Sequence, residues 1–120
     1  MSDSVGLNGN QLMLDITTHA QLMYRKAEQG NWAWAKHSLR AMVKSLVAFA
    51  LRKPNLAKWV EDFDQDIRPH LEKAIDQQDW HAFQLAWAEM ITLTNMAHQA
   101  ANKPFIILGS PAHGGSMLDE

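Results

Sequence analysis

The chain has 120 residues, a formal net charge of −2 at pH 7, and 47% hydrophobic against 20% charged residues. This balance argues against a disordered chain, and the length suits one domain. The chain contains no cysteine, which excludes disulfides, thiolate catalysis, zinc-thiolate sites, iron-sulfur clusters and covalent haem attachment through thioethers.

The N-terminal stretch MSDSVGLNGNQLMLD lacks the basic start and apolar run of a signal peptide. No stretch of the sequence approaches the ~20 apolar residues that cross a membrane. We therefore expect a cytoplasmic protein that does not span a membrane. We expect a flexible N-terminus at 1–9, a single four-helix domain at 10–111 and a flexible tail at 112–120.

Helical periodicity begins at about residue 10 and continues to about residue 29. Gly30 suits the position after a helix end, and Asn31 is a good N-cap for a second helix. The second helix should end before Pro54. Apolar residues in these two helices recur three or four positions apart: Leu12, Ile16, Ala20 and Met23, then Trp32, Ala35, Leu39, Met42, Leu46 and Phe49.

A third periodic segment follows Pro54, and Pro69 interrupts it, so we expect a kink or a change of helix near Asp66. Asp79 can cap a fourth helix, which Lys103 and Pro104 end. The apolar stripes again alternate by three and four: Leu56, Val60, Phe63, Ile67, Leu71 and Ala74, then Trp80, Phe83, Trp87, Met90, Thr94, Ala97 and Ala101.

The second and fourth helices match at an offset of 48 residues, since Asn31-Trp32 corresponds to Asp79-Trp80. Two hairpins of similar design predict an all-α, antiparallel up-down-up-down four-helix bundle with a kinked third helix and an extended C-terminal tail. At this offset, Thr94 and Ala97 stand where the second helix has the larger residues Leu46 and Phe49. Small side chains there allow either close helix packing or space for a ligand, and general packing density favours close packing.

The six histidines show none of the spacings of a metal site, such as HExxH or Glu-x-x-His, and we predict no metal. Asp15 with His19, and Asp66 with His70, are pairs four residues apart that favour surface hydrogen bonds. His19 and His98 instead flank the apolar stripes of the first and fourth helices. Either histidine could be a boundary residue with a backbone partner, and His98 would border a pocket if the small-residue end holds one.

Charge is unevenly distributed along the chain. Residues 25–58 contain eight bases and one acid, whereas residues 61–89 contain eight acids and two bases, so the two halves could attract each other within one bundle or across a dimer. Lys36, Arg40 and Lys44 form a basic stripe that could meet nucleic acid or another anion. The pI of about 6.3 and the absence of aromatic residues on that face instead favour a solvated face, or one that faces the acidic third helix of a neighbour.

No nucleophile-base pattern and no phosphate-binding glycine loop is present, so we predict a protein that is not an enzyme. Trp34 and Trp59 fall outside the apolar stripes. Each could anchor a protein partner, or be half-buried packing.

Several short motifs occur in an order that resembles small bacterial four-helix-bundle c-type cytochromes with the cytochrome c-prime fold. Such proteins carry an early histidine, an Asn-Trp helix start, an Ile-x-Pro, and later a Cys-Asn-x-Cys-His followed by Pro-Phe-Ile. The corresponding positions spread over about 90 residues: His19, Asn31-Trp32, Ile67-Arg68-Pro69, Ala74-Ile75 to Asp79, Phe83, Asn95, His98 and Pro104-Phe105-Ile106.

Thr94 and Ala97 replace both attachment cysteines, so the resemblance implies a relative without covalent haem. In that family, haem is attached outside the cytoplasm, which agrees with the absence of a secretion signal. The second helix is basic where the family is often acidic, which puts a shared redox partner in doubt.

We hypothesise a non-catalytic, cytoplasmic binding or interaction module, which forms a homodimer through its Trp-rich or charged faces and binds an unknown protein partner or a small apolar ligand. The alternative is a non-covalent haem protein for electron transfer or gas sensing, with His98 as axial ligand and His19 as a possible second. A weaker alternative is anion or nucleic-acid binding through the basic stripe. The predicted pocket comprises Trp87, Ile91, Thr94, Ala97 and His98, closed by Phe105 and Ile106.

Overall fold

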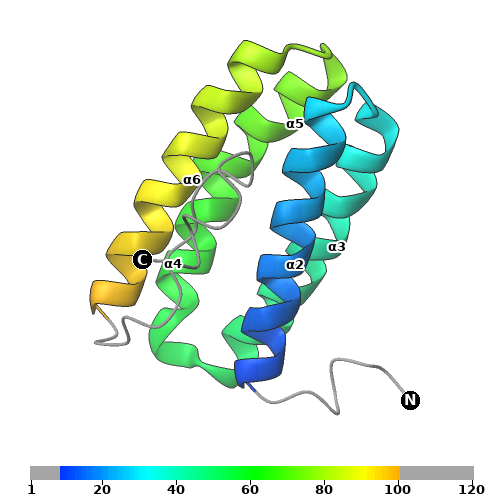
Figure 1. The fold of residues 1–120 in the computed structure, drawn as a ribbon. Coiled ribbons are helices and arrows are strands. Elements are labelled where there is room, and N and C mark those ends of the chain that lie inside the picture. The colour runs from blue at the N-terminus through cyan, green and yellow to red at the C-terminus, as the bar shows by residue number, and fades with distance from the viewer. Residues whose placement is uncertain (1–8, 101–120) are drawn as a thin grey trace.

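The computed structural model describes residues 9–100, with side chains from residue 9 to residue 97. Regular structure in this range is entirely helical and forms four helical units packed side by side (Figure 1). The all-α, four-helix class is therefore confirmed. The units are α2 (Gly9–Glu28), α3 (Trp32–Arg52), a composite third unit of η1 (Pro54–Leu56), α4 (Ala57–Asp62), η2 (Phe63–Ile67) and α5 (Arg68–Asp76), and finally α6 (Trp80–Ala100).

The predicted flexible tail at 112–120 lies outside the described residues, as do the extended C-terminal tail before it and residues 1–8 of the predicted flexible N-terminus. Gly9, the last residue of that predicted N-terminus, instead begins α2. Within the described range, no helix combines the length and apolar character that a membrane span requires.

The turn between α2 and α3 forms at the predicted residues. Gly30 adopts a φ of 79°, which glycine reaches without a steric penalty. Its N–H donates to the carbonyl of Ala27 at 2.9 Å, and the N–H of Asn31 donates to that of Lys26 at 2.8 Å. The Asn31 side chain accepts from the N–H of Trp34 at 3.2 Å. These bonds form a Schellman C-cap followed directly by an N-cap, and they confirm both predicted roles.

The turn between α5 and α6 repeats this arrangement 48 residues later. The N–H of Gln78 donates to the carbonyl of Ile75 at 3.0 Å, and the N–H of Asp79 donates to that of Ala74 at 2.9 Å. The predicted cap forms because the Asp79 carboxylate accepts from the N–H of Ala82 at 3.0 Å. Gln78, however, stands where the first turn has glycine, and its φ is 54°. The second turn therefore holds an ordinary side chain in the left-handed region.

The third unit changes helix type where the sequence predicts an interruption. Its central segment η2 is a π-helix, and the N–H of Arg68 donates to the carbonyl of Phe63, five residues earlier. Pro69 occupies the first turn of α5. Proline has no N–H to give to the preceding turn, and a π-helical turn is one way in which a helix accommodates a break in its hydrogen-bond ladder.

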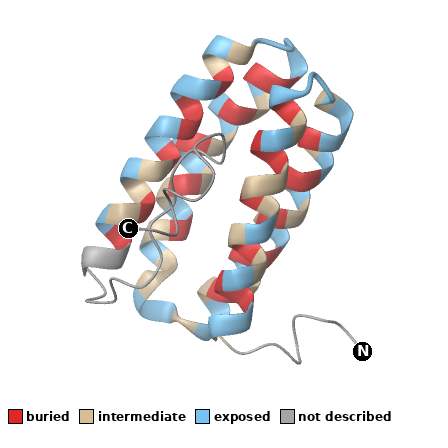
Figure 2. Ribbon diagram, viewed as in Figure 1, coloured by how far each residue is buried: buried red, intermediate tan, exposed pale blue. Residues whose placement is uncertain are grey.

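The core lies where the apolar stripes of the four units face one another, and Figure 2 shows the buried residues on these inward faces. At the end next to the two turns, five aromatic side chains form a cluster. The rings of Tyr24 and Trp87 are 4.9 Å apart, those of Tyr24 and Trp80 are 5.3 Å apart, and those of Trp80 and Phe83 are 5.7 Å apart. Trp32 extends the cluster to α3 through Phe83. This aromatic cluster joins α2, α3 and α6.

The helices α2 and α3 have the most extensive contact of any two elements. Their buried residues include several with small side chains, so the two backbones can approach closely. Ala20, Ala35 and Ser38 are 0% exposed, and Ala27 is 2% exposed. Small side chains thus occur in the first hairpin as well as in α6, where the sequence comparison noted them.

The left-handed conformation of Gln78 gives a prediction for stability. Gln78→Gly should raise the free energy of unfolding by about 1 kcal/mol, because glycine relieves the strain of a side chain in the left-handed region. Gln77→Gly is the matched control, since Gln77 has a φ of −86°, and it should lower stability through greater freedom of the unfolded chain. Urea unfolding measures both. A loss of stability in Gln78→Gly equal to that in Gln77→Gly would contradict the prediction.

Candidate functional site

The predicted pocket residues on α6 form one largely buried face that begins at Trp87 and continues into the C-terminal half of the helix. Trp87 and Thr94 are each 3% exposed, Ala97 is 8% exposed, and Ile91 is half-buried. The expected place of Thr94 and Ala97 on the buried stripe of α6 is confirmed.

The side chains of the other three predicted pocket residues lie outside the part of the chain that the structure describes. His98 lies within α6, but its side chain is outside the described residues, as are Phe105 and Ile106 entirely. How the pocket would be closed therefore stays a prediction.

Trp87 connects this face to the aromatic cluster. Its ring lies against Tyr24 of α2 and is nearly parallel to that of Phe83, with centroids 6.2 Å apart. Among the described residues, its buried indole N–H has no hydrogen-bond acceptor, and the buried side-chain oxygen of Asn95 has no partner. Buried polar atoms normally have partners, so these two atoms of α6, like the buried hydroxyl of Ser38 in α3, are exceptions within the core.

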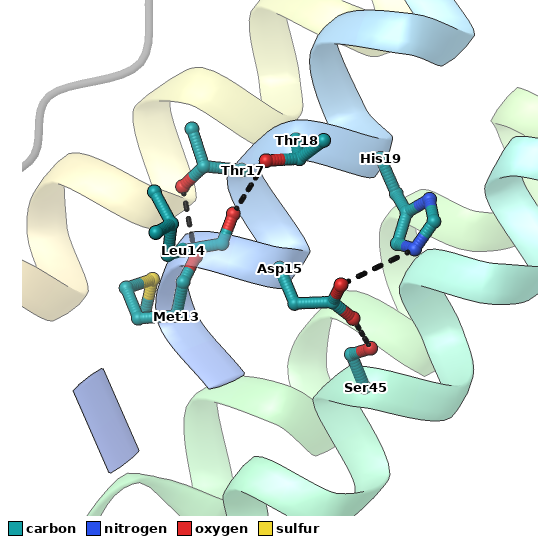
Figure 3. Close-up of polar contacts among 7 residues, drawn as sticks. All are labelled: Met13, Leu14, Asp15, Thr17, Thr18, His19 and Ser45. Atoms are coloured by element: carbon teal, nitrogen blue, oxygen red, sulfur yellow. Dashed lines mark hydrogen bonds and ion pairs between the residues drawn. The ribbon is translucent and has the colours of Figure 1, made fainter. Parts of the chain in front are cut away.

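His19 lies in a polar cluster between α2 and α3, which Figure 3 shows. Its Nε2 atom is 3.5 Å from Oδ1 of Asp15, one turn earlier, as the four-residue spacing predicts. The hydroxyl of Ser45, on α3, donates a short hydrogen bond to Oδ2 of the same carboxylate. The Nδ1 atom of His19 is buried without a partner. The carboxylate of Asp15 thus links the two helices.

The order of groups in this cluster determines what it can do chemically. In a serine hydrolase the imidazole stands between the hydroxyl and the carboxylate, so that it can remove the hydroxyl proton. Here the carboxylate of Asp15 stands between Ser45 and His19. The arrangement suits a structural tie between helices. For His19 to ligate haem through Nε2, the ring would have to leave Asp15.

One of the three bases in the basic stripe of α3 forms an ion pair within the chain. Nζ of Lys36 lies 2.6 Å from Oδ1 of Asp76, at the end of α5. This contact joins the basic and acidic halves of the sequence within one chain, one of the two possibilities that the charge pattern left open. Arg40 and Lys44 are exposed and form no ion pair with the described residues.

His70 contacts a different partner from the one that its spacing suggests. Its Nδ1 atom lies 3.0 Å from Oε1 of Glu89 on α6, rather than pairing with Asp66. The prediction of a surface pair with Asp66 is wrong because His70 faces the neighbouring helix. His70 and Glu89 border a shallow groove of about 540 Å³ between α5 and α6, lined also by Ala82 and Leu85.

A second groove, of about 330 Å³, lies between α3 and the α4–η2 segment. Val47 and Leu51 line its α3 side and are 55% and 79% exposed. These two residues are not among the predicted site residues, because they lie off the buried stripe of α3. A detectable signal was present, namely two large apolar residues four positions apart, and thus on one face of the helix.

The two tryptophans outside the stripes differ in exposure. Trp34 is 47% exposed, with His37 edge-on at 5.2 Å and the ammonium of Lys26 5.8 Å from its ring centre. Trp59 is half-buried, and its N–H has no partner. Trp34 therefore has the accessibility that a partner anchor needs.

Among residues 9–100, no three histidine or acidic side chains come together in an arrangement that could hold a metal ion. No family model, curated protein or solved structure matches the chain. The resemblance to four-helix cytochromes accordingly rests on the sequence motifs alone.

The link between α2 and α3 can be tested by removing the Ser45 hydroxyl. Ser45→Ala should lower the free energy of unfolding by about 1 kcal/mol, because a hydrogen bond to a carboxylate is lost. Thr18→Ala is the control, since the exposed Thr18 hydroxyl bonds only to the carbonyl of Leu14 in its own helix, and should change stability by less than about 0.5 kcal/mol. Equal effects of the two substitutions in urea unfolding would show that the Asp15 link contributes nothing.

Proposed function

We propose that the chain is a non-catalytic, cytoplasmic binding and interaction module that takes a small apolar ligand beside the C-terminal half of α6. The observation that carries this proposal is the buried indole N–H of Trp87, which has no acceptor among the described residues. Thr94 and Ala97 follow on the same buried stripe. An unpartnered buried donor costs about 1–3 kcal/mol, so an apolar molecule with one hydrogen-bond acceptor would gain this energy on binding there.

The internal repeat supports this location. At the equivalent positions of α3, Leu46 and Phe49 are 2% and 4% exposed and fill the core with large side chains. Thr94 and Ala97 fill much less volume at the corresponding places in α6. Apolar surroundings with a few placed polar atoms are typical of small-molecule sites between the helices of a bundle.

Non-covalent haem is the second candidate ligand. The observation that favours it is the burial of Thr94 and Ala97, where a c-type cytochrome would have its cysteines, with His98 one turn beyond Thr94 in α6. A neutral imidazole at this place could serve as an axial ligand for electron transfer or gas sensing. His19 is the less suitable second ligand, since it contacts Asp15.

The proposal also covers the direction of the helices, the relationship of the fold and the oligomeric state. We propose an antiparallel up-down-up-down bundle that is kinked at η2, related to bacterial cytochromes of the c-prime fold, and active as a homodimer. The two nearly identical turns support the antiparallel arrangement, since each reverses the chain with the same hydrogen bonds. Anion binding through the basic stripe is the weakest alternative, because Asp76 already neutralises Lys36.

Filling the small-residue end tests the ligand site. Thr94→Leu should weaken binding of the amphipathic fluorophore anilinonaphthalene sulfonate, whose aromatic rings would enter the site, because a larger side chain would occupy that space. We expect a loss of about tenfold in affinity, which corresponds to about 1.4 kcal/mol. Thr92→Leu is the control: Thr92 is exposed and its hydroxyl bonds within α6, so binding should be unchanged. Fluorescence titration measures both, with circular dichroism to check folding.

The outcomes separate the proposals. Unchanged binding by folded Thr94→Leu would exclude a ligand site at this end of α6. Titration with hemin addresses the alternative: a Soret shift that His98→Ala abolishes, and that the exposed-site control His81→Ala retains, would identify haem as the ligand. Weak hemin binding that is insensitive to both changes would exclude haem.

A further inference from the structure

The groove between α3 and α4–η2 exposes apolar side chains that the core of this chain does not use. Val47 and Leu51 form its outer α3 side, and Ala57 and Val60 line the opposite side. Leu51, at 79%, is the most exposed of the large hydrophobic residues that the structure describes. Burying a valine or leucine side chain contributes about 1.5–3 kcal/mol, so covering this surface would be favourable.

Charges of opposite sign stand on the two sides of this groove. On α3, Lys44 lies three residues (about one turn) and Arg40 seven residues (about two turns) before Val47, so both share the side of the helix that carries Val47. Both are exposed. The α3 side of the groove is therefore positive.

The opposite side carries acids of α4 and η2. Two of these are already paired, since Asp62 lies 2.7 Å from Lys58 and Asp64 lies 2.6 Å from Arg68. The hydrogen bond to Asp62, followed by the attraction of its charge, raises the pKa of Lys58. Glu61 lines the groove, is exposed and forms no ion pair with the described residues. Glu61 therefore adds a negative charge to the lining of the groove.

We propose that the groove is the homodimer interface of this protein, and that its occupant is a second copy of the same chain. A two-fold axis parallel to the groove exchanges its two sides, so α3 of each subunit faces α4–η2 of the other. The exposed apolar residues then cover one another. Lys44 faces Glu61 of the partner subunit, and this contact occurs twice. An axis perpendicular to the groove would instead place α3 against α3, with like charges opposed.

This inference deepens the self-association in the proposed function and is independent of the ligand site on α6. Two charge reversals test it by sedimentation velocity. Lys44→Glu and Glu61→Lys should each weaken the dimer at least tenfold, because each creates two like-charge contacts. An equimolar mixture of the two variants should restore dimers, since both contacts of the mixed dimer then join opposite charges.

An apolar substitution supplies a second, independent readout. Val47→Asp should yield monomer, whereas Leu85→Asp, at a similarly exposed leucine (58%) in the other groove, should remain dimeric. Circular dichroism checks that each variant is folded.

Wild-type protein that stays monomeric at about 100 μM, or dimers that both reversals leave intact, would overturn the proposal. Failure of the mixture to re-form dimers would do the same, and would indicate a partner of another kind. Thr94→Leu should leave the dimer intact in sedimentation velocity, so the two proposals fail separately.

Discussion

The aromatic contacts of Tyr24 are the constraint on which the arrangement of the helices depends. Tyr24 belongs to the first hairpin, yet its ring touches Trp80, Phe83 and Trp87 of α6. The helices α2 and α6 otherwise share few contacts. The aromatic cluster therefore fixes α6 at the end next to the two turns. Because a helix is rigid, this anchor also determines that Thr94 lies on the buried face further along.

The two ends of the structure consequently differ. Beside the turns, large aromatic rings fill the core, and each turn is closed by the same backbone bonds. At the C-terminal half of α6 the buried residues are small, and the side-chain oxygen of Asn95 has no partner among the described residues. The proposed ligand site occupies this second end. The proposed dimer groove lies on a separate face, between α3 and α4–η2, so ligand binding and association use different residues.

Local signals predicted the helices well because they act within a few residues. Apolar periodicity identified each buried stripe. The caps at Asn31 and Asp79 were predictable because each side chain bonds to a backbone N–H only three residues further along the chain. Contacts between helices depend on how each helix is rotated, which a single sequence does not specify. His70 therefore contacts Glu89 instead of Asp66, and Asp15 contacts Ser45 as well as His19. The burial of Thr94 was predictable from the apolar periodicity of its own helix. The groove beside Val47 was not, because it forms only where α3 packs against α4–η2.

Hydrogen exchange along α6 tests most directly the central claim, that the helix is anchored at the aromatic end and receives a ligand at the other. Without ligand, amides at residues 83–90 should be more strongly protected than those at residues 94–97, because large buried rings surround only the first group. Saturating anilinonaphthalene sulfonate should increase protection at 94–97 and leave 83–90 nearly unchanged. Uniform protection along α6, unaffected by the fluorophore, would contradict the account.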